Sequence, residues 1–400
     1  MSTDATIEQL QGNWSFPTAV TFGAGTIQQL PAACREEGIS RPLLVTDAAL
    51  ATLDFVTRLI DVNRHAGVET GLYSAVKSNP TGGNVEQGVQ VYQRGAHDGV
   101  IALGGGSALD AGKAIALMVG QHRPMWDFED EGDNWQKVDA DGIAPLIAIP
   151  TTAGTGSEVG RASVIVDENQ QRKIIIFHPG MLANRVIADP GLTTGLPPAL
   201  TAATGMDALV HSLEAYCASG YHPMADGIAL QAMSLIHRWL PVAFNEADNL
   251  EARSHMLAAS MMGAVAFQKG LGAVHALAHP LGALYDKHHG LLNAILLPYV
   301  LQHNRPAIGD KLIHLARVLE LTEVSVDGFL EWIAQLRQTL RIPDDLQSIG
   351  IDSDQSQRIG EMAAADPSAA GNPVELSPAQ YRTLFEQAVN PQFSPGGAAN

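Results

Sequence analysis

The stretch IALGGGSALDAGK, residues 101–113, runs from a short apolar segment through three successive glycines into a helical pattern. Glycine allows the backbone to approach an anion closely, and the first turn of a helix presents free N–H groups and the positive end of its dipole. The segment therefore predicts a diphosphate site formed by Gly105, Gly106 and Ser107. It is not the GxGxxG fingerprint, so an ordinary tight strand-to-helix turn remains the alternative interpretation.

A second loop of the same character follows another apolar segment. Residues 150–158, PTTAGTGSE, supply Thr151, Thr152 and Thr155 directly after the strand predicted at 145–151. Ligands of parallel α/β sheets bind at the carboxyl ends of the strands, so the two loops together predict one cofactor site. For this loop the alternative is a Ser/Thr-rich cap.

Asp47 ends a third apolar segment, RPLLVTD. A carboxylate in this position can accept hydrogen bonds from an adenosine ribose and repels a 2′-phosphate, which favours NAD over NADP. A helix N-cap explains the residue equally well.

These segments belong to a regular alternation of strands and helices in the first half of the chain. Strands are predicted at 16–23, 41–47, 98–104 and 145–151, and helices at 25–37 and 107–119. The strand segments are short and continuously apolar, as in a mostly parallel sheet covered on both faces. Beyond the Pro- and Gly-rich segment 190–198 the strand pattern ends, and helices are predicted at 199–218, 223–242, 250–267, 272–285, 309–320, 326–340 and 378–389. We therefore expect an α/β domain at 1–192 and an all-helical domain at 193–400.

Composition limits the class of protein. The 400 residues carry 24 basic and 42 acidic side chains, a formal net charge of −18, which disfavours nucleic acid and anionic membranes as partners. Cys34 and Cys217 are the only cysteines and form no CxxC pair, which fits a reducing compartment. Residues 1–14 contain acids and no apolar core, so they do not resemble a signal peptide, and no stretch reaches ~18 uninterrupted apolar residues. We expect a cytoplasmic enzyme that does not span a membrane.

Two segments of the second half combine carboxylate and imidazole side chains at helical spacing. GMDALVHSLEAY places Asp207 and His211 four residues apart. VHALAHPLGALYDKHHG places His275 and His279 four apart, followed by His289 in a glycine-flanked turn. Side chains four apart share one face of a helix. One carboxylate with several imidazoles is the ligand set of a Zn²⁺ or Fe²⁺ site.

Spacing leaves several choices open. A single Asp–His pair on a helix is more often a surface or capping contact than a pair of metal ligands. His288 competes with His289, and Glu214 is a further ligand, an acceptor that holds a ligand, or a structural residue. Lys269, six residues before His275, is either a solvated lysine at a helix end, which is the favoured interpretation, or a partner for a substrate carboxylate.

The motifs GGGSALDAGK, PTTAGTGSE, GMDALVHSLEAY and HALAHPLGALYDKHHG, taken in this order, resemble those of the iron-containing (group III) alcohol dehydrogenases. FPTAVTFGAGTIQQL is similar to the opening hairpin and helix of that family, and NPVELSPAQYRTLFEQA is similar to its closing segment. The segment FHPGML at 177–182 departs from the usual pattern. The resemblance covers nearly the whole chain. It implies a dinucleotide-binding α/β domain, a helical domain of the dehydroquinate-synthase-like kind, and an active site in the cleft between them.

Carried over residue by residue, the resemblance assigns roles to individual positions. The implied metal ligands are Asp207, His211, His275 and His289. It is the resemblance, not the spacing, that prefers His289 to His288. It also implies that His279 lies beside the nicotinamide and moves the alcohol proton. The implied cofactor-binding residues are Asp47, Gly105, Gly106, Ser107, Asp110, Thr151, Thr152 and Thr155, with Lys173 and Leu192 on looser local alignment.

The resemblance also implies a reaction. Bound Fe²⁺, or Zn²⁺, lowers the pKa of the alcohol hydroxyl, hydride passes from the alkoxide carbon to NAD⁺, and the proton leaves through His279 and water. The expected substrates are primary alcohols, diols or hydroxy acids, and NADH drives the reverse reduction. A homodimer is a family-level expectation. The alternatives are a dehydroquinate-synthase-like cyclase, for which basic side chains near the ligand segments are too few, a glycerol-dehydrogenase-like zinc enzyme, and a binding protein without catalysis.

Overall fold

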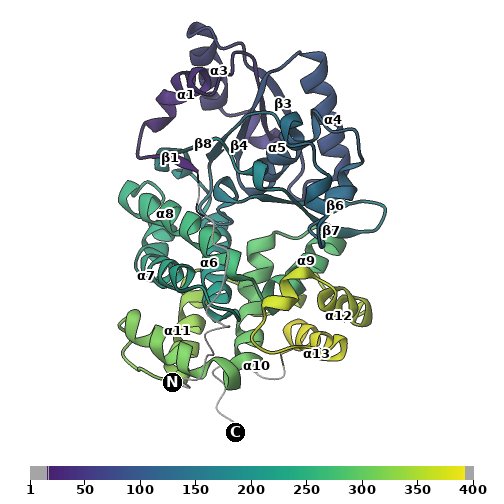
Figure 1. Cartoon of the computed structure of the whole chain (residues 1–400). Helices are drawn as coiled ribbons and strands as arrows, with labels where there is room; N and C mark the ends of the chain where they lie inside the picture. Colours follow the sequence, from purple (N-terminus) through teal and green to yellow (C-terminus); the bar gives the residue numbers. More distant parts are fainter. Residues whose placement is uncertain (1–15, 17, 392–400) are drawn as a thin grey trace. The chain divides into compact units, whose positions relative to one another are not determined.

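The structure is a computed structural model that describes residue 16 and residues 18–391. Contacts between residues divide the described chain between Gly195 and Leu196 into an α/β unit and a helical unit. Figure 1 shows strands only in the first unit and long helices in the second. The predicted fold class, a parallel-sheet domain followed by a helical domain, is confirmed. The segment 1–14, which does not resemble a signal peptide in sequence, lies outside the described residues.

The α/β unit is built on a sheet in which every strand pairs in parallel with its neighbours. In spatial order the strands are β1 (Ala19–Phe22), β8 (Arg185–Ala188), β5 (Leu146–Pro150), β4 (Gly99–Gly104), β2 (Pro42–Asp47) and β3 (Gly71–Val76). From β2 the chain passes outward to the edge strand β3, whereas from β4 it passes to β5 on the opposite side. The carboxyl ends of β2 and β4 therefore flank the point where the connections diverge, which is where sheets of this kind bind ligands.

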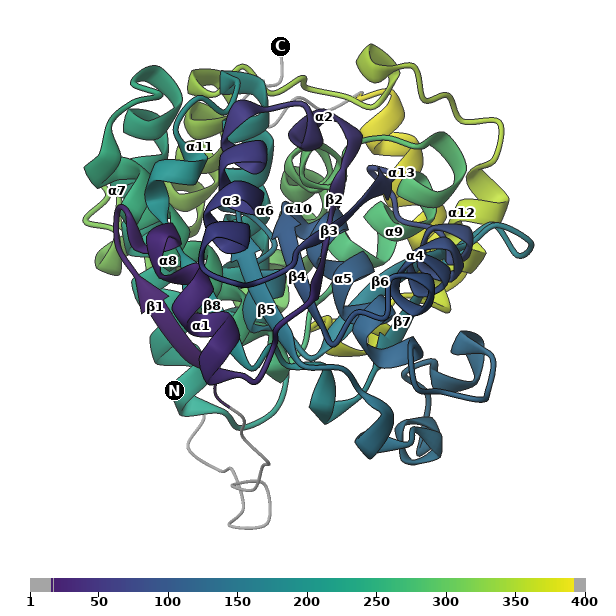
Figure 2. The same cartoon turned by 90° about the horizontal axis from the view of Figure 1, so that it is seen from above.

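Helices cover both faces of this sheet (Figure 2). On one face, α1 (Leu30–Glu36) and α3 (Asp54–His65) pack against the strands. The buried cluster that they share with the sheet includes Leu30, Cys34, Val56, Leu59, Leu44, Ile101, Leu103, Ile147, Ile149 and Ile187. On the other face lie α4 (Gly82–Arg94) and α5 (Gly106–Met118). Gly112 of α5 lies so close to the sheet that a Cβ built on it would be 2.5 Å from the Cβ of Ala102.

Two elements of the α/β unit differ from the prediction or were not predicted. The expected opening hairpin falls partly outside the described residues, and β1 itself pairs in parallel with β8 rather than in a hairpin. A separate antiparallel hairpin, β6 (Ala162–Asp167) and β7 (Arg172–Phe177), contacts α5 and was not predicted.

The helical unit consists mainly of helices close to the predicted ranges. They are α6 (Pro198–Cys217), α7 (Pro223–Asn245), α8 (Leu250–Ala266), α9 (Ala273–Tyr285), α10 (His289–Val318), α11 (Val326–Thr339), α12 (Ser356–Ala364) and α13 (Pro378–Val389). Helix α10 is much longer than the predicted 309–320, and α12 was not predicted. Because α6 is buried over almost its whole length, its polar side chains need partners inside the protein.

No single helix of the described residues has both the length and the apolar character of a membrane span. Only the pair Leu250–Lys269 and Ala273–Tyr285, bent by 106°, meets these criteria when the two helices are taken together.

Candidate metal centre and cofactor loops

The predicted metal ligands come from three helices of the helical unit. Asp207 and His211 lie one turn apart in α6, and both are almost completely buried. His275 belongs to the first turn of α9. His289 is the first residue of α10, not part of a turn as expected, because the N-cap of that helix is His288. His288 is exposed, whereas His289 is partly buried.

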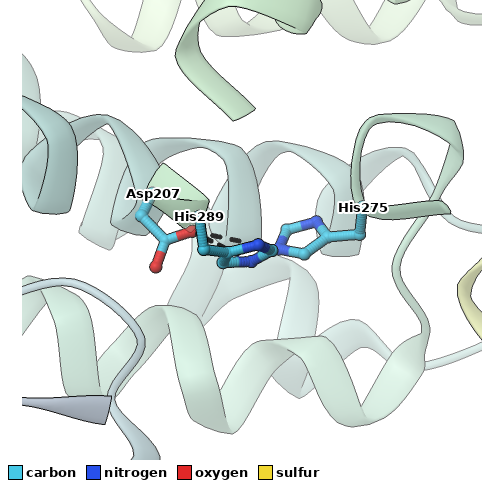
Figure 3. Close-up of side chains that lie close together, drawn as sticks. All are labelled: Asp207, His275 and His289. Carbon is cyan, nitrogen blue, oxygen red and sulfur yellow. Dashed lines mark ion pairs between the residues drawn. The ribbon is translucent and has the colours of Figure 1, made fainter. Parts of the chain in front are cut away.

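The predicted ligand side chains lie close to one another in the structure. The ligand atoms of Asp207, His275 and His289 lie within 4.8 Å of one another, and Figure 3 shows the three side chains converging. Asp207 Oδ1 is 3.7 Å from His289 Nε2 and 4.0 Å from His275 Nε2. His211 lies beside this group, with its Nε2 2.9 Å from His275 Nε2 and its Nδ1 3.8 Å from Asp207 Oδ1.

These distances suit a single small cation. Ligand atoms about 2.1 Å from one ion in a tetrahedral arrangement are roughly 3.4 Å from one another. The separations of 2.9, 3.7 and 4.0 Å lie on either side of this value. The cluster also contains buried His211 Nδ1, which has no hydrogen-bond partner among the described residues. One carboxylate and three imidazoles are donors that bind Fe²⁺ or Zn²⁺, so the residues fit such an ion.

The surroundings shift the pKa values of two of the imidazoles in opposite directions. Burial lowers the pKa of His211 to about 4, although the nearby Asp207 carboxylate opposes this effect, so the ring is neutral at pH 7. Burial acts in the same direction on the pKa of His275, but the carboxylates of Glu214, Asp207 and Asp366 outweigh it and raise that pKa.

Glu214 holds the ring of His275. Its Oε2 accepts the hydrogen bond from His275 Nδ1 at 2.6 Å, which leaves the Nε2 lone pair facing the other ligands. The same carboxylate accepts the backbone N–H groups of Gly272, at 3.0 Å, and Val274, at 2.7 Å. Of the three possibilities left open by the sequence, the contacts of Glu214 are those of an acceptor that holds a ligand.

Two asparagines complete the support of α9. Asn372 Oδ1 accepts the backbone N–H of Ala273 at 3.1 Å, and it also accepts the side-chain amide of Asn304 at 2.8 Å. Asn372 in turn donates to Asn304 Oδ1 and to the carbonyl of Val374. The first turn of α9, which carries His275, is therefore fixed by side chains from α6, from α10 and from the segment before α13.

A further polar residue in the centre was missed in the sequence. Asn293 lies one turn after His289 and is fully buried, and its Nδ2 donates to Asp207 Oδ1 at 2.7 Å. The same nitrogen is 3.2 Å from the Nε2 atoms of both His275 and His289. The sequence did contain a signal for Asn293, because it is the one polar residue in the apolar segment LLNAILL. An asparagine there is expected to be buried, and a buried amide requires hydrogen-bond partners.

His279 lies next to the ligand cluster without being part of it. Its ring is nearly parallel to that of His289, with centroids 5.4 Å apart, and its centroid is 5.9 Å from that of His275. Its Nδ1 is 2.8 Å from Asp366 Oδ2. The structure thus places the predicted proton-transfer residue beside the predicted metal ligands and adds a carboxylate that was not predicted.

In the α/β unit, the two glycine- and threonine-rich loops lie against each other. The backbone N–H of Thr151 donates to the carbonyl of Gly104 at 2.9 Å. A Cβ built on Gly105 would be 3.2 Å from the Thr152 hydroxyl, and one built on Gly106 would be 2.8 Å from the Thr155 hydroxyl. Larger residues at these two glycines would push the loops apart.

Asp47 lies beside the same loops at the end of β2. It is the N-cap of the short helix α2 (Ala48–Ala51), because its Oδ1 accepts the N–H groups of Ala49 and Leu50. A Cβ built on Gly104 would be 3.9 Å from Asp47 Oδ2. The side chain thus serves as a helix cap and also lies next to the glycine turn.

The remaining predicted cofactor residues have mainly internal contacts. The Ser107 hydroxyl donates to the carbonyl of Ser78. Asp110 is buried, forms an ion pair with Lys113 at 3.1 Å, and accepts hydrogen bonds from the Ser157 hydroxyl and the N–H of Val164. Lys173 lies in β7 opposite Val166, and Leu192 packs against the cluster beneath α1 and α3.

Glu158, in the loop after β5, is completely buried, and burial raises its pKa to about 7, against the influence of Lys113. Because this folded-state pKa exceeds the ordinary glutamate pKa of 4.5, the stabilisation is complete below pH 4.5 and is lost as the pH rises through 7. Glu158→Gln cannot ionise, so we expect it to gain about 1 kcal/mol in free energy of unfolding relative to the wild type between about pH 6 and pH 8. Urea unfolding at the two pH values measures this gain.

Glu168→Gln, at a half-exposed carboxylate in the β6–β7 hairpin, serves as the control. It should show no such pH dependence. An equal stability difference between Glu158→Gln and the wild type at both pH values would contradict the assignment.

Lys269 is not the solvated lysine that the sequence favoured. Its side chain is only 3% exposed, and its Nζ is 2.5 Å from Asp226 Oδ1. It also donates to the carbonyl of Tyr216 near the end of α6, where a cation complements the helix dipole. The correction follows from this partner, because a lysine neutralised by a carboxylate can be buried.

Comparison with known proteins identifies the family. A family model described as iron-containing alcohol dehydrogenase matches residues 17–190, and one for the C-terminal part of the Fe-containing alcohol dehydrogenase family matches residues 201–389. The chain is 36% identical to 4-hydroxybutyrate dehydrogenase of Cupriavidus necator, over 93% of this chain and 98% of the relative. It is 35% identical to 1,3-propanediol dehydrogenase of Klebsiella pneumoniae, over 93% and 97% of the two chains.

A solved structure agrees with these relatives. The crystal structure of a 1,3-propanediol oxidoreductase matches 94% of this chain and 100% of its own, with a TM-score of 0.87 and 34% identity. One family thus accounts for both halves of the chain, and the matches extend over nearly the full length of each of these proteins. The chain belongs to the iron-containing alcohol dehydrogenase family and catalyses the NAD-dependent oxidation of an alcohol and the reverse reduction.

Proposed function

We propose that Asp207, His211, His275 and His289 hold one Fe²⁺ ion at which the alcohol is oxidised. The convergence of the ligand atoms of Asp207, His275 and His289 from three helices carries the proposal, and His211 lies against His275. The ion, when bound, supplies Lewis acidity that makes the alcohol hydroxyl a stronger acid. Zn²⁺ fits the same donors, and the choice of Fe²⁺ rests on the family.

The cofactor is assigned to the loops after β4 and β5. The first turn of α5 has no side-chain cap, so its N–H groups are available to the diphosphate of NAD. Gly105, Gly106 and Ser107 form this turn, and the hydroxyls of Thr152 and Thr155 lie against it. The further residues proposed on the cofactor side are Asp47, Asp110, Thr151, Lys173 and Leu192. The carboxylate of Asp47 favours NAD over NADP, because it would repel a 2′-phosphate.

The chain's own part in the reaction is orientation and proton transfer. The alcohol carbon gives a hydride to C4 of NAD⁺, and the hydroxyl gives up a proton. The products are an aldehyde or ketone, NADH and one proton. His279 is the proposed route for that proton, since its ring lies beside His289 and His275 and its Nδ1 is already bound to Asp366.

The proposed substrates are small primary alcohols that carry a second polar group. The names of two relatives support this class, because 1,3-propanediol and 4-hydroxybutyrate both contain a terminal CH₂OH on a short chain. The compounds differ at the other end, where one has a hydroxyl and the other a carboxylate.

Removal and return of the metal tests the proposal. We expect protein purified without oxygen and stripped by a chelator to lose NAD⁺ reduction with 1,3-propanediol and 4-hydroxybutyrate, and to regain it with Fe²⁺. Activity that persists in the stripped protein would contradict the metal centre. Restoration by Zn²⁺ alone would correct the identity of the ion.

The oligomeric state and the cellular location are proposed from observations outside the metal centre. We propose a homodimer that forms at the β1 edge of the sheet, since β1 pairs only with β8 among the described residues and exposes Val20 and Phe22. Light scattering should then give twice the chain mass of 42.3 kDa.

A cytoplasmic location is supported by Cys34 and Cys217, which are buried free thiols. Fractionation of the producing cells checks it.

A further inference from the structure

Asp366 is placed to control the ring of His279. It lies between α12 and the 3₁₀ turn Pro367–Gly371, of which it is the N-cap. One oxygen, Oδ1, accepts the N–H of Ser368 at 2.8 Å, and the other, Oδ2, is 2.8 Å from His279 Nδ1. Both side chains are 8% exposed, so little water competes for this contact. The carboxylate is thus held from one side by its own turn and presents its second oxygen to the imidazole.

The contact has a defined direction. An ionised carboxylate only accepts hydrogen bonds, so the proton between the two groups belongs to His279 Nδ1. Burial by itself would raise the pKa of Asp366, but His279 and the hydrogen bonds from Ser368 outweigh burial and lower it, so the group is ionised at pH 7. With Nδ1 protonated, the neutral ring has its lone pair on Nε2. Nε2 is then the only ring atom able to take a proton.

We propose that Asp366 is a positioning residue that keeps His279 in the Nδ1–H tautomer and in a fixed ring orientation, so that Nε2 receives the alcohol proton. This inference rests on the proposed role of His279. Glu214 makes the same kind of contact to Nδ1 of His275, at 2.6 Å, and leaves Nε2 of that ring facing the other ligands. Two carboxylates thus orient two histidines that lie one turn apart in α9. Glu214 turns His275 toward the proposed ion, and Asp366 turns His279 toward the alcohol hydroxyl.

Asp366→Asn tests the proposal with almost no change in shape. The Asn oxygen can still accept the N–H of Ser368, which turns the side-chain NH₂ group toward His279. Two donors cannot face each other, so the ring must move its proton to Nε2. We expect kcat for alcohol oxidation to fall about 10- to 100-fold, with little change in KM or metal content. In the double variant with His279→Gln, Asp366→Asn should add no further loss.

The tautomer itself provides a readout that does not depend on turnover. In protein labelled with ¹⁵N-histidine and loaded with Zn²⁺, the ring signals that disappear in His279→Gln belong to His279. They should report Nδ1–H in the wild type and Nε2–H in Asp366→Asn. Asp189→Asn is a matched control, since Asp189 also precedes a proline and caps a 3₁₀ turn, yet its second oxygen accepts the N–H of Ile27. It should leave the His279 tautomer unchanged.

The outcomes separate the inference from the proposed function. An unchanged tautomer in Asp366→Asn, or losses that multiply in the double variant, would overturn the positioning role. Full activity in His279→Gln would instead remove His279 from the proton route. The ring signals would still show whether Asp366 sets its tautomer.

Discussion

Asp207→Ala is expected to abolish metal binding and to lower kcat/KM for alcohol oxidation by about three orders of magnitude or more. Asp207 is the only carboxylate in the ligand cluster, and its Oδ1 lies 3.7–4.0 Å from nitrogens of His211, His275 and His289. Without it, three imidazoles remain and no carboxylate ligand balances the charge of a divalent cation. Elemental analysis of the purified variant and steady-state NAD⁺ reduction measure the two effects.

A suitable control is Asp344→Ala, since Asp344 belongs to the same unit and its side chain is 91% exposed. This variant should keep both its metal and its rate. Far-UV circular dichroism of Asp207→Ala should show the helical content of the wild type, because the helices that carry the ligands are held by apolar contacts. A variant that retained its ion and full turnover would show that the metal centre is elsewhere.

Glu214→Gln removes none of the four proposed ligands, yet it should weaken metal binding about 10- to 100-fold. The carboxylate accepts three hydrogen bonds, from His275 and from the backbone of Gly272 and Val274. A glutamine has one oxygen, so its NH₂ group must face one of these donors. In either orientation of the amide one contact is lost and the negative charge beside His275 Nδ1 is removed, so the ring is held less firmly and unfolding should become easier by about 1–3 kcal/mol. Competition with a chelator of known affinity measures the metal dissociation constant.

High metal concentration should restore most of the rate of Glu214→Gln, whereas it cannot restore Asp207→Ala. Glu251→Gln, at an exposed position in the first turn of α8, should bind metal like the wild type. If Glu214→Gln bound metal normally and still lost its rate, the carboxylate would act in a step other than metal retention.

The parts of the fold that could be predicted are those with a simple burial pattern. Strands β2, β4 and β5 are buried on both faces, so they are continuous apolar segments between turn residues. The edge strand β3 mixes buried, partly buried and exposed residues without alternation and begins at a glycine, so its sequence pattern was too weak to predict a strand. Helix α10 contains Pro298 and Pro306 and is apolar all round in its first half, which hid the start of the helix at His289.

In the candidate site, too, some residues could be predicted from the sequence and others could not. Neighbours along one helix, such as Asp207 and His211, are visible as a spacing of four residues. The partners of these side chains are not, because Asp366 is 87 positions from His279 and Asn293 is 86 positions from Asp207. Asn293 reaches Asp207 only because α10 packs against α6, and Asp366 reaches His279 only because the turn after α12 packs against α9. Family resemblance could select His289 over His288, but it did not indicate what holds each ring.

The support of α9 by Asn372 and Asp366 has a consequence for biosynthesis. Chains are made from the N-terminus, and all four proposed ligands precede residue 290. Two of the side chains that hold α9, Asn372 at its first turn and Asp366 at the ring of His279, are synthesised some eighty residues later. A growing chain on the ribosome therefore has its donor atoms before it can hold them in place. We therefore expect stable loading of the ion to follow completion of the chain rather than synthesis of the proposed ligands.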